Sequence, residues 1–246
     1  MRTVEKFTPA TAGGLQHCNW PTMTRDVDAH GWAIVEHLLT PVECRSVAAL
    51  YDQDAAFRSR VVMARHGFGN GEYRYFSYPL PALLEELRPA LYAGLVPLAN
   101  SWNERMGVDT RYPQHFADFQ ERCRAAGQGR PTPLLLKYTK GDFNCLHQDI
   151  YGEHVFPLQV AVLLSVPGDD FTGGEFILTE QKPRQQSRAT VAPLGQGDAV
   201  VFAVRHRPVR GTKGFYRVNQ RHGVSTVLSG WRYTLGIIFH DASGTT

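Results

Sequence analysis

From residue 131 onward the chain alternates short apolar or β-branched runs with clusters of turn-forming residues. The runs lie at 134–138, 157–165, 175–178, 199–204 and 233–239. Glycine, proline and aspartate separate them, and no helical spacing of apolar residues lies between them. Many short strands without intervening helices favour antiparallel pairing in two layers. The second half therefore predicts an antiparallel barrel or a jelly roll, the double-stranded β-helix, and we favour the latter.

The first half carries helical signals instead. Residues 40–43 (TPVE) have the pattern of a helix start, with threonine as N-cap and glutamate completing a capping box. A leucine stripe predicts a second helix from about 81 to 106, and Pro89 and Pro97 are expected to kink or split it. A third helix is predicted from 114 to 126.

These patterns predict a mainly β chain with some α structure, organised as one domain over residues 26–246. Residues 26–130 are expected to be mostly helical and to support one sheet. Residues 131–246 are expected to form the jelly-roll core. Residues 1–25 are polar without periodicity and are expected to form a flexible arm.

Composition limits the binding partners and the cellular compartment that we expect for the chain. The net charge of +3 is mildly basic and does not by itself indicate a nucleic-acid partner. Four cysteines without paired spacing argue against a disulfide framework and a thiolate zinc site, and we expect Cys145 to be a buried small hydrophobe. The first residues have no apolar run of a signal peptide, and no stretch has the length of a membrane span. We therefore expect a cytoplasmic protein.

Three residues have the chemistry of a metal site. His147 and Asp149 are two positions apart, so both side chains can point to the same side of a strand. His222 completes two imidazoles and one carboxylate, the facial triad typical of non-haem Fe(II) sites with open positions. We expect His222 to come from a strand of the other sheet. An HxD tripeptide alone is weak evidence, because it arises often by chance.

Residues that could hold a carboxylate accompany the triad. Arg232 and Thr234 share one strand face, and a planar guanidinium can bind a carboxylate through two hydrogen bonds. Tyr138 can add a phenolic hydrogen bond. These groups fit the distal carboxylate of 2-oxoglutarate, so we expect Fe(II), 2-oxoglutarate and O2 to be used together.

The order of motifs resembles the Fe(II)/2-oxoglutarate-dependent oxygenase superfamily, with spacing similar to its prolyl-hydroxylase-like branch. The run 137–149, the Gly173-Gly174-Glu175 turn, the run 197–202, His222 and Arg232 carry this resemblance. The closing run 222–241 is similar, more narrowly, to a little-studied bacterial group for which a role on damaged or alkylated nucleic acid has been suggested by analogy. The resemblance implies hydroxylation, iron bound by the triad, and 2-oxoglutarate bound by Arg232, Thr234 and Tyr138.

Other histidines compete with His222 as the distal ligand. His206 follows an apolar strand, but the residues after it are polar and supply no arginine on a strand. His240 ends the last strand without a downstream arginine and is expected to be structural. His154 is expected to be a loop histidine.

Residues 205–221 form a basic segment with six Arg or Lys and no acid. We consider two hypotheses for this segment. It is either a solvated loop or a loop at the pocket mouth that binds a phosphate or carboxylate of the substrate. Candidate substrate residues are Arg205, Arg207 and Arg210 from this segment, and Arg74 from a loop-like stretch nearer the N-terminus.

Three functions remain open on this reading. The first is hydroxylation of a small, anionic amino-acid-like or natural-product-like substrate. The second is oxidative dealkylation of alkylated nucleic acid, supported by basic residues beside aromatic ones. The third is a metal-binding sensor without catalysis, against which the complete set of ligands and arginine argues.

Overall fold

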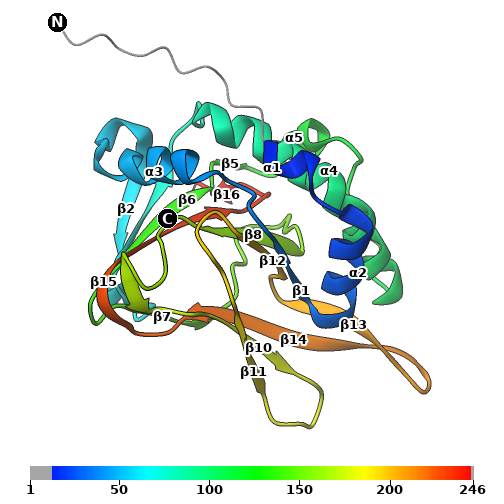
Figure 1. Ribbon diagram of the computed structural model, residues 1–246. Coiled ribbons are helices and arrows are strands. Elements are labelled where there is room, and N and C mark those ends of the chain that lie inside the picture. The colour runs from blue at the N-terminus through cyan, green and yellow to red at the C-terminus, as the bar shows by residue number, and fades with distance from the viewer. Residues whose placement is uncertain (1–12, 245–246) are drawn as a thin grey trace, which may run out of the picture.

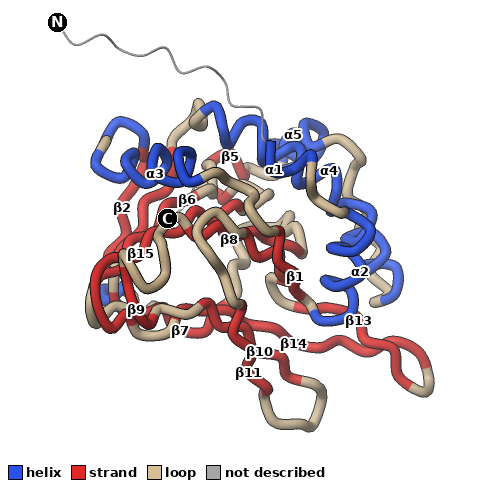
Figure 2. The backbone as a smooth tube through the Cα atoms, in the orientation of Figure 1, coloured by secondary structure: helices blue, strands red, loops and turns tan. Residues whose placement is uncertain are grey.

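Two antiparallel sheets lie face to face, with helices covering the outer face of the larger sheet (Figures 1 and 2). The computed structural model describes residues 13–244. Its helices are α1 (Gly13–Gln16), α2 (Trp20–His30), α3 (Pro41–Ala49), α4 (Ala82–Arg105) and α5 (Phe116–Ala125), with short 3-10 turns at Leu50–Asp52, Asp54–Ala56 and Met63–Arg65. None of these helices is long and apolar enough to cross a membrane.

The eight-stranded sheet runs in the order β1 (Trp32–Val35), β12 (Ala199–Ala203), β8 (Leu158–Leu163), β15 (Val227–Ile237), β6 (Leu134–Thr139), β4 (Glu72–Phe76) and β2 (Phe57–Val62), with β9 (Phe171–Gly173) joined to β15. The six-stranded sheet runs β11 (Arg188–Ala192), β10 (Phe176–Gln181), β14 (Gly214–Val224), β7 (Phe143–His147) and β3 (Gly69–Asn70), with β13 (His206–Gly211) joined to β14. A small pair joins β16 (Ala242–Ser243) to β5 (Gln128–Arg130). The predicted jelly roll is confirmed, and the sheets do not close into a barrel.

The strands of the larger sheet divide their side chains between two environments. In β8, Val160 and Val162 belong to the main core beneath the helices, whereas Gln159 and Ala161 line a cavity between the sheets. The side chains of β15 alternate in the same way, so Thr234 faces that cavity. Because neighbouring residues of a strand point to opposite faces, one apolar sheet supports the helix layer and the site at once.

Helix α4 is the main element of the helix layer. Of the two outcomes predicted for Pro89 and Pro97, a kink or a split, the split does not occur, because the helix runs unbroken from Ala82 to Arg105. Its buried stripe, including Leu87, Leu91 and Leu95, packs on the sheet. This burial offsets the backbone hydrogen bonds that two prolines remove.

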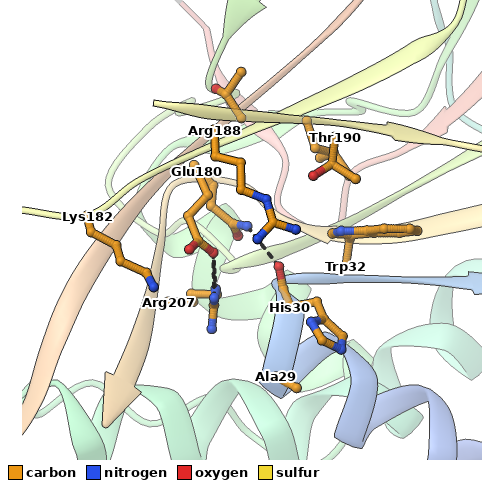
Figure 3. Close-up of a pocket in the computed structure, with 11 residues that line it drawn as sticks. Ala29, His30, Trp32, Glu180, Lys182, Arg188, Thr190 and Arg207 are labelled. Carbon is orange, nitrogen blue, oxygen red and sulfur yellow. Dashed lines mark hydrogen bonds and ion pairs between the residues drawn. The ribbon is translucent and has the colours of Figure 1, made fainter. Parts of the chain in front are cut away.

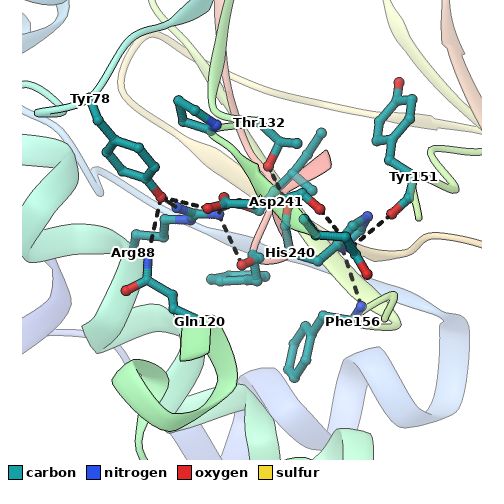
Figure 4. Close-up of polar contacts among 12 residues, drawn as sticks. Tyr78, Arg88, Gln120, Thr132, Tyr151, Phe156, His240 and Asp241 are labelled. Atoms are coloured by element: carbon teal, nitrogen blue, oxygen red, sulfur yellow. Dashed lines mark hydrogen bonds and ion pairs between the residues drawn. The ribbon is translucent and has the colours of Figure 1, made fainter. Parts of the chain in front are cut away.

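A buried polar network ties this layer to the end of the chain (Figure 4). The guanidinium of Arg88 pairs with Asp241 at 2.7 Å and donates to the carbonyls of Ile238 and Phe239. Tyr78 donates to the same aspartate at 2.8 Å. The network therefore fixes α4 against the end of the larger sheet.

The start of α3 agrees with the prediction, whereas α2 was not predicted. The capping box at Thr40 and Glu43 is present, with reciprocal side-chain and backbone hydrogen bonds. The expected arm is too long, because α2 begins at Trp20 and buries Met23 against the core. The part of the arm at residues 1–12 lies outside the described residues.

Two stretches expected to be loops are strands. The loop-like stretch around Arg74 forms β2 and β4, which extend the larger sheet, although helices still make up most of the regular structure of residues 26–130. The basic segment 205–221 is a β-hairpin of β13 and β14 that projects from the body (Figure 1). In both cases pairing with neighbouring strands outweighs a polar composition, because one face of an antiparallel strand can stay in contact with solvent.

Candidate active site

The triad predicted from the sequence comes together in space. His147 ends β7, and its partner across the strand pair is His222 in β14. Both histidines therefore belong to the same six-stranded sheet, which corrects the expectation of opposite sheets. Asp149 lies two residues past the end of β7, and one ligand atom from each of the three residues falls within 4.8 Å of the others. Among residues 13–244 this is the one cluster of its kind.

One hydrogen bond orients the His147 ring, and the candidate ligand atoms of the three residues lie close together. Nδ1 of His147 donates to the Cys145 carbonyl at 2.7 Å, which leaves Nε2 with its lone pair free. That Nε2 lies 3.6 Å from one oxygen of Asp149, and Nε2 of His222 lies 3.4 Å from the other. Separations of this size suit three atoms that share one ion.

The Asp149 carboxylate is itself held by two donors. Tyr151 donates to its Oδ1 at 2.7 Å, and Gln159 donates to its Oδ2 at 2.9 Å. Burial acts to raise the pKa of Asp149, but the hydrogen bond from His222 and the two imidazoles hold that pKa well below its usual range. Burial lowers the pKa of His222, and His147 lowers it further. The Asp149 carboxylate is therefore ionised, which is the state that binds a metal.

Arg232 lies deeper in the same cavity, in β15 opposite Tyr138 of β6. Only 1% of its surface is exposed, and burial lowers its pKa to about 10, so it remains charged at neutral pH. One Nη donates to the hydroxyl of Thr234, whereas Nε has no partner. No carboxylate of the described chain lies within ion-pair distance. A buried cation without a counter-ion is costly, so this position favours binding of an anion.

The cavity between the sheets has a volume of about 390 Å³. Its walls include seven phenylalanine and tyrosine side chains, from Phe68, Tyr73, Tyr75, Tyr138, Tyr151, Phe176 and Phe202. Tyr138 is fully buried, and its hydroxyl lies 3.3 Å from the Asn144 amide, which donates to it. All six residues predicted to bind iron or 2-oxoglutarate line this one cavity.

The arginines predicted to bind substrate do not line it. Arg207 is buried in an ion pair with Glu180, and Arg205 and Arg210 are exposed on the hairpin. Arg74 pairs with Asp54 at 2.5 Å and stacks over Tyr51. The physical reason is the two-residue period of β4, which turns Tyr73 and Tyr75 toward the cavity and the residue between them away.

The rival histidines stay outside the cluster. His206 begins β13, and His240 is buried, where its Nδ1 accepts a hydrogen bond from the Phe156 backbone at 3.2 Å. His154 lies in the loop after Asp149, half-buried, and its backbone bonds to Gln128. His240 therefore has the structural role expected of it.

Sequence reasoning missed several residues around the ligands. Gln159 interrupts an otherwise apolar strand, and Tyr151 follows Asp149 at the same spacing that separates the first two ligands. Both features are visible in the sequence and could have indicated contacts to the carboxylate. The expectation for Cys145 was wrong, because this residue is exposed and lines the cavity.

Solved structures share this fold at low sequence identity. A prolyl-4-hydroxylase of Pseudomonas putida aligns with a TM-score of 0.51 and 17% identity, covering 92% of this chain and 100% of that one. A 2OG-Fe(II) oxygenase family oxidoreductase of Burkholderia pseudomallei aligns with a TM-score of 0.54 and 15% identity, covering 93% and 95%. A Trichoplax adhaerens prolyl hydroxylase gives 0.55 and 15%, covering 93% and 91%. These likenesses concern the fold.

Sequence comparison finds relatives of higher sequence identity. Uncharacterized proteins from two Mycobacterium tuberculosis strains are 51% identical over 168 residues, which is 68% of this chain and 72% of theirs. Residues 71–242 match the family Oxygenase-NA, described as "Oxygenase, catalysing oxidative methylation of damaged DNA". The chain belongs to this family of oxygenase enzymes.

Proposed function

We propose that the chain is a dioxygenase that binds Fe(II) through His147, Asp149 and His222 and binds 2-oxoglutarate through Arg232. The observation that carries the proposal is the buried guanidinium without a counter-ion in the same cavity as three converging metal ligands. When bound, iron and 2-oxoglutarate supply an O2-dependent oxidant that hydroxylates a C–H bond as the keto-acid becomes succinate and CO2.

Side chains around the cavity would position iron and 2-oxoglutarate. Arg232 and Thr234 offer neighbouring donors to the distal carboxylate, and Tyr138 lines the space beside them. Tyr151 and Gln159 hold Asp149 from outside, so that its two oxygens cannot rotate freely. The aromatic walls exclude water from the reacting carbon.

For the substrate, we propose an alkylated base of DNA. The description of the family to which the chain belongs supports this class. The arginines that would have favoured a small anionic substrate lie away from the cavity, and flat aromatic side chains line it instead. Hydroxylation of an N-alkyl carbon gives a hemiaminal, which breaks down to the unmodified base and an aldehyde.

The first test measures succinate formed from 2-oxoglutarate under air. Fe(II) should be required, and His147→Ala should abolish succinate formation, whereas His206→Ala should leave it unchanged. Iron binding without any succinate would instead support a sensor.

The second test compares prime substrates. Single-stranded oligonucleotides with N-methylated bases, small amino-acid-like acids and proline-rich peptides would be offered at equal concentration, and each product analysed by mass spectrometry. Loss of the methyl group from an oligonucleotide is expected. Hydroxylation of a small acid or a peptide, with the methylated oligonucleotide untouched, would contradict the proposed substrate.

A further inference from the structure

A second cavity has a volume of about 350 Å³, and residues that line it are drawn in Figure 3. Its walls come from β10, β11 and β14, together with the end of α2 and the start of β1. β10 flanks β14 on one side, and β7, which carries His147, flanks it on the other. The second cavity therefore lies on the β10 side of β14, whereas His147 and Asp149 lie on the β7 side.

The cavity carries more positive than negative charge. Arg207 and Glu180 neutralise each other in a buried ion pair. Lys182 and Arg188 line the same space, and no carboxylate of the described residues lies within ion-pair distance of either (Figure 3). Two cations at one cavity without acidic partners favour an anionic ligand.

A buried amide in the cavity wall lacks a partner. Gln220 is 2% exposed, and its Nε2 donates to the His30 carbonyl at 3.3 Å, but its Oε1 accepts no hydrogen bond. The amide lies against Gly31, where a Cβ atom would come within 2.1 Å of Nε2. A buried acceptor of this kind favours a ligand with an N–H donor.

An indole supplies an apolar wall. Trp32 is half-buried and packs against the cluster of Phe176, Leu178 and Phe202, while part of its ring remains in the cavity (Figure 3). Aromatic side chains beside cations are the combination that holds a base and its phosphate.

We propose that this cavity binds one nucleotide unit, with the phosphate on Lys182 and Arg188, the base beside Trp32, and an N–H of the base on Gln220. The inference rests on the proposed nucleic-acid substrate and adds to it a second contact. Gln220 is two residues before His222 on the same strand, and Leu178 is the cross-strand partner of His222. A nucleotide held here would lie next to the strand that carries a metal ligand.

The test measures binding of a fluorescently labelled, unmethylated single-stranded oligonucleotide by anisotropy. The full chain would be kept anaerobic with Fe(II) and 2-oxoglutarate, and salt would be varied. The variants are Lys182→Gln/Arg188→Gln and Gln220→Leu, and the control is Arg210→Gln, which removes an exposed arginine outside the cavity. Succinate formation without oligonucleotide is measured in parallel and reports the metal centre separately.

The double variant should weaken binding by about tenfold or more and reduce the salt slope by about one unit for each cation removed. Gln220→Leu should weaken binding without changing the slope, and Arg210→Gln should resemble the unaltered chain. Competition by free nucleoside monophosphates would identify a free nucleotide as the ligand, and competition by oligonucleotides alone would identify a strand.

Three results would overturn the inference. These are absence of oligonucleotide and nucleotide binding, unchanged binding in the double variant, and equal competition by inorganic phosphate, which would exclude recognition of the base. Each result is independent of succinate formation, so a chain that binds nucleotides but forms no succinate would reject the proposed function and leave the second cavity supported.

Discussion

Two side chains outside the predicted triad hold the Asp149 carboxylate in place. Tyr151 donates to one oxygen of Asp149 and Gln159 to the other, so the orientation in which this carboxylate would meet the proposed iron is fixed. Such contacts around a ligand commonly account for 10- to 100-fold (roughly) in metal affinity.

We expect Tyr151→Phe to weaken metal binding by about 10- to 100-fold, because it removes only the hydroxyl that donates to Asp149. Titration with Co(II), followed by its visible absorption, measures this without turnover. Tyr216→Phe, on the projecting hairpin, is the matched control and should bind Co(II) like the unaltered chain. Equal affinities in both variants would contradict the role of Tyr151.

Arg232→Lys should raise the KM for 2-oxoglutarate by about tenfold or more, since an ammonium cannot make two parallel hydrogen bonds to a carboxylate. Co(II) binding should be unchanged, because Arg232 is not a ligand. The measurement is succinate formation over a range of 2-oxoglutarate concentrations, with the exposed Arg210→Lys as control. An unchanged KM would show that the co-substrate carboxylate binds elsewhere.

At the scale of elements, local signals predicted the start of α3 and several strands of the larger sheet. Helix α3 begins where the capping box at Thr40 places it, and β6, β8 and β12 follow apolar runs. The strands β2 and β4 and the hairpin of β13 and β14 were missed, because charged residues alternate there with aromatic or aliphatic ones. Pairing with a neighbour decides such segments, and a local pattern does not contain that neighbour.

Thr40→Ala should lower the free energy of unfolding by about 1 kcal/mol, because the side chain that accepts from the Glu43 backbone is lost. Urea unfolding followed by circular dichroism measures it. Val42→Ala, in the same helix and exposed, should change stability by about 0.5 kcal/mol or less. A similar loss in the two variants would argue against the cap.

At the scale of the whole molecule, one network joins the helix layer to the sheet that carries Arg232. Arg88 in α4 and Asp241 near the chain end are both almost fully buried, and they pair across 153 positions of sequence. Their contact, with Tyr78 and Gln120 alongside, is drawn in Figure 4.

Asp241→Leu should lower the free energy of unfolding by about 3–5 kcal/mol, because it leaves a buried guanidinium without its carboxylate. Chemical denaturation provides the measurement. Glu121→Gln breaks the exposed pair with Arg124 and should cost about 1 kcal/mol or less. If both variants lost only about 1 kcal/mol of unfolding free energy or less, the hydrogen bonds from Arg88 to the carbonyls of Ile238 and Phe239 would be sufficient to stabilise the buried guanidinium without Asp241.

The sequence by itself predicted the jelly roll, which the structure confirms, and indicated His147, Asp149 and His222 as candidate metal ligands and Arg232 with Thr234 as a candidate carboxylate-binding pair. These depend on strand period and on side-chain chemistry, both of which are local. Only the tertiary structure decided that His147 and His222 are neighbours in one sheet, that Arg207 is paired with Glu180, and which residues surround Asp149. Those facts depend on which strands pair and in what register, and contacts between residues far apart in sequence set both.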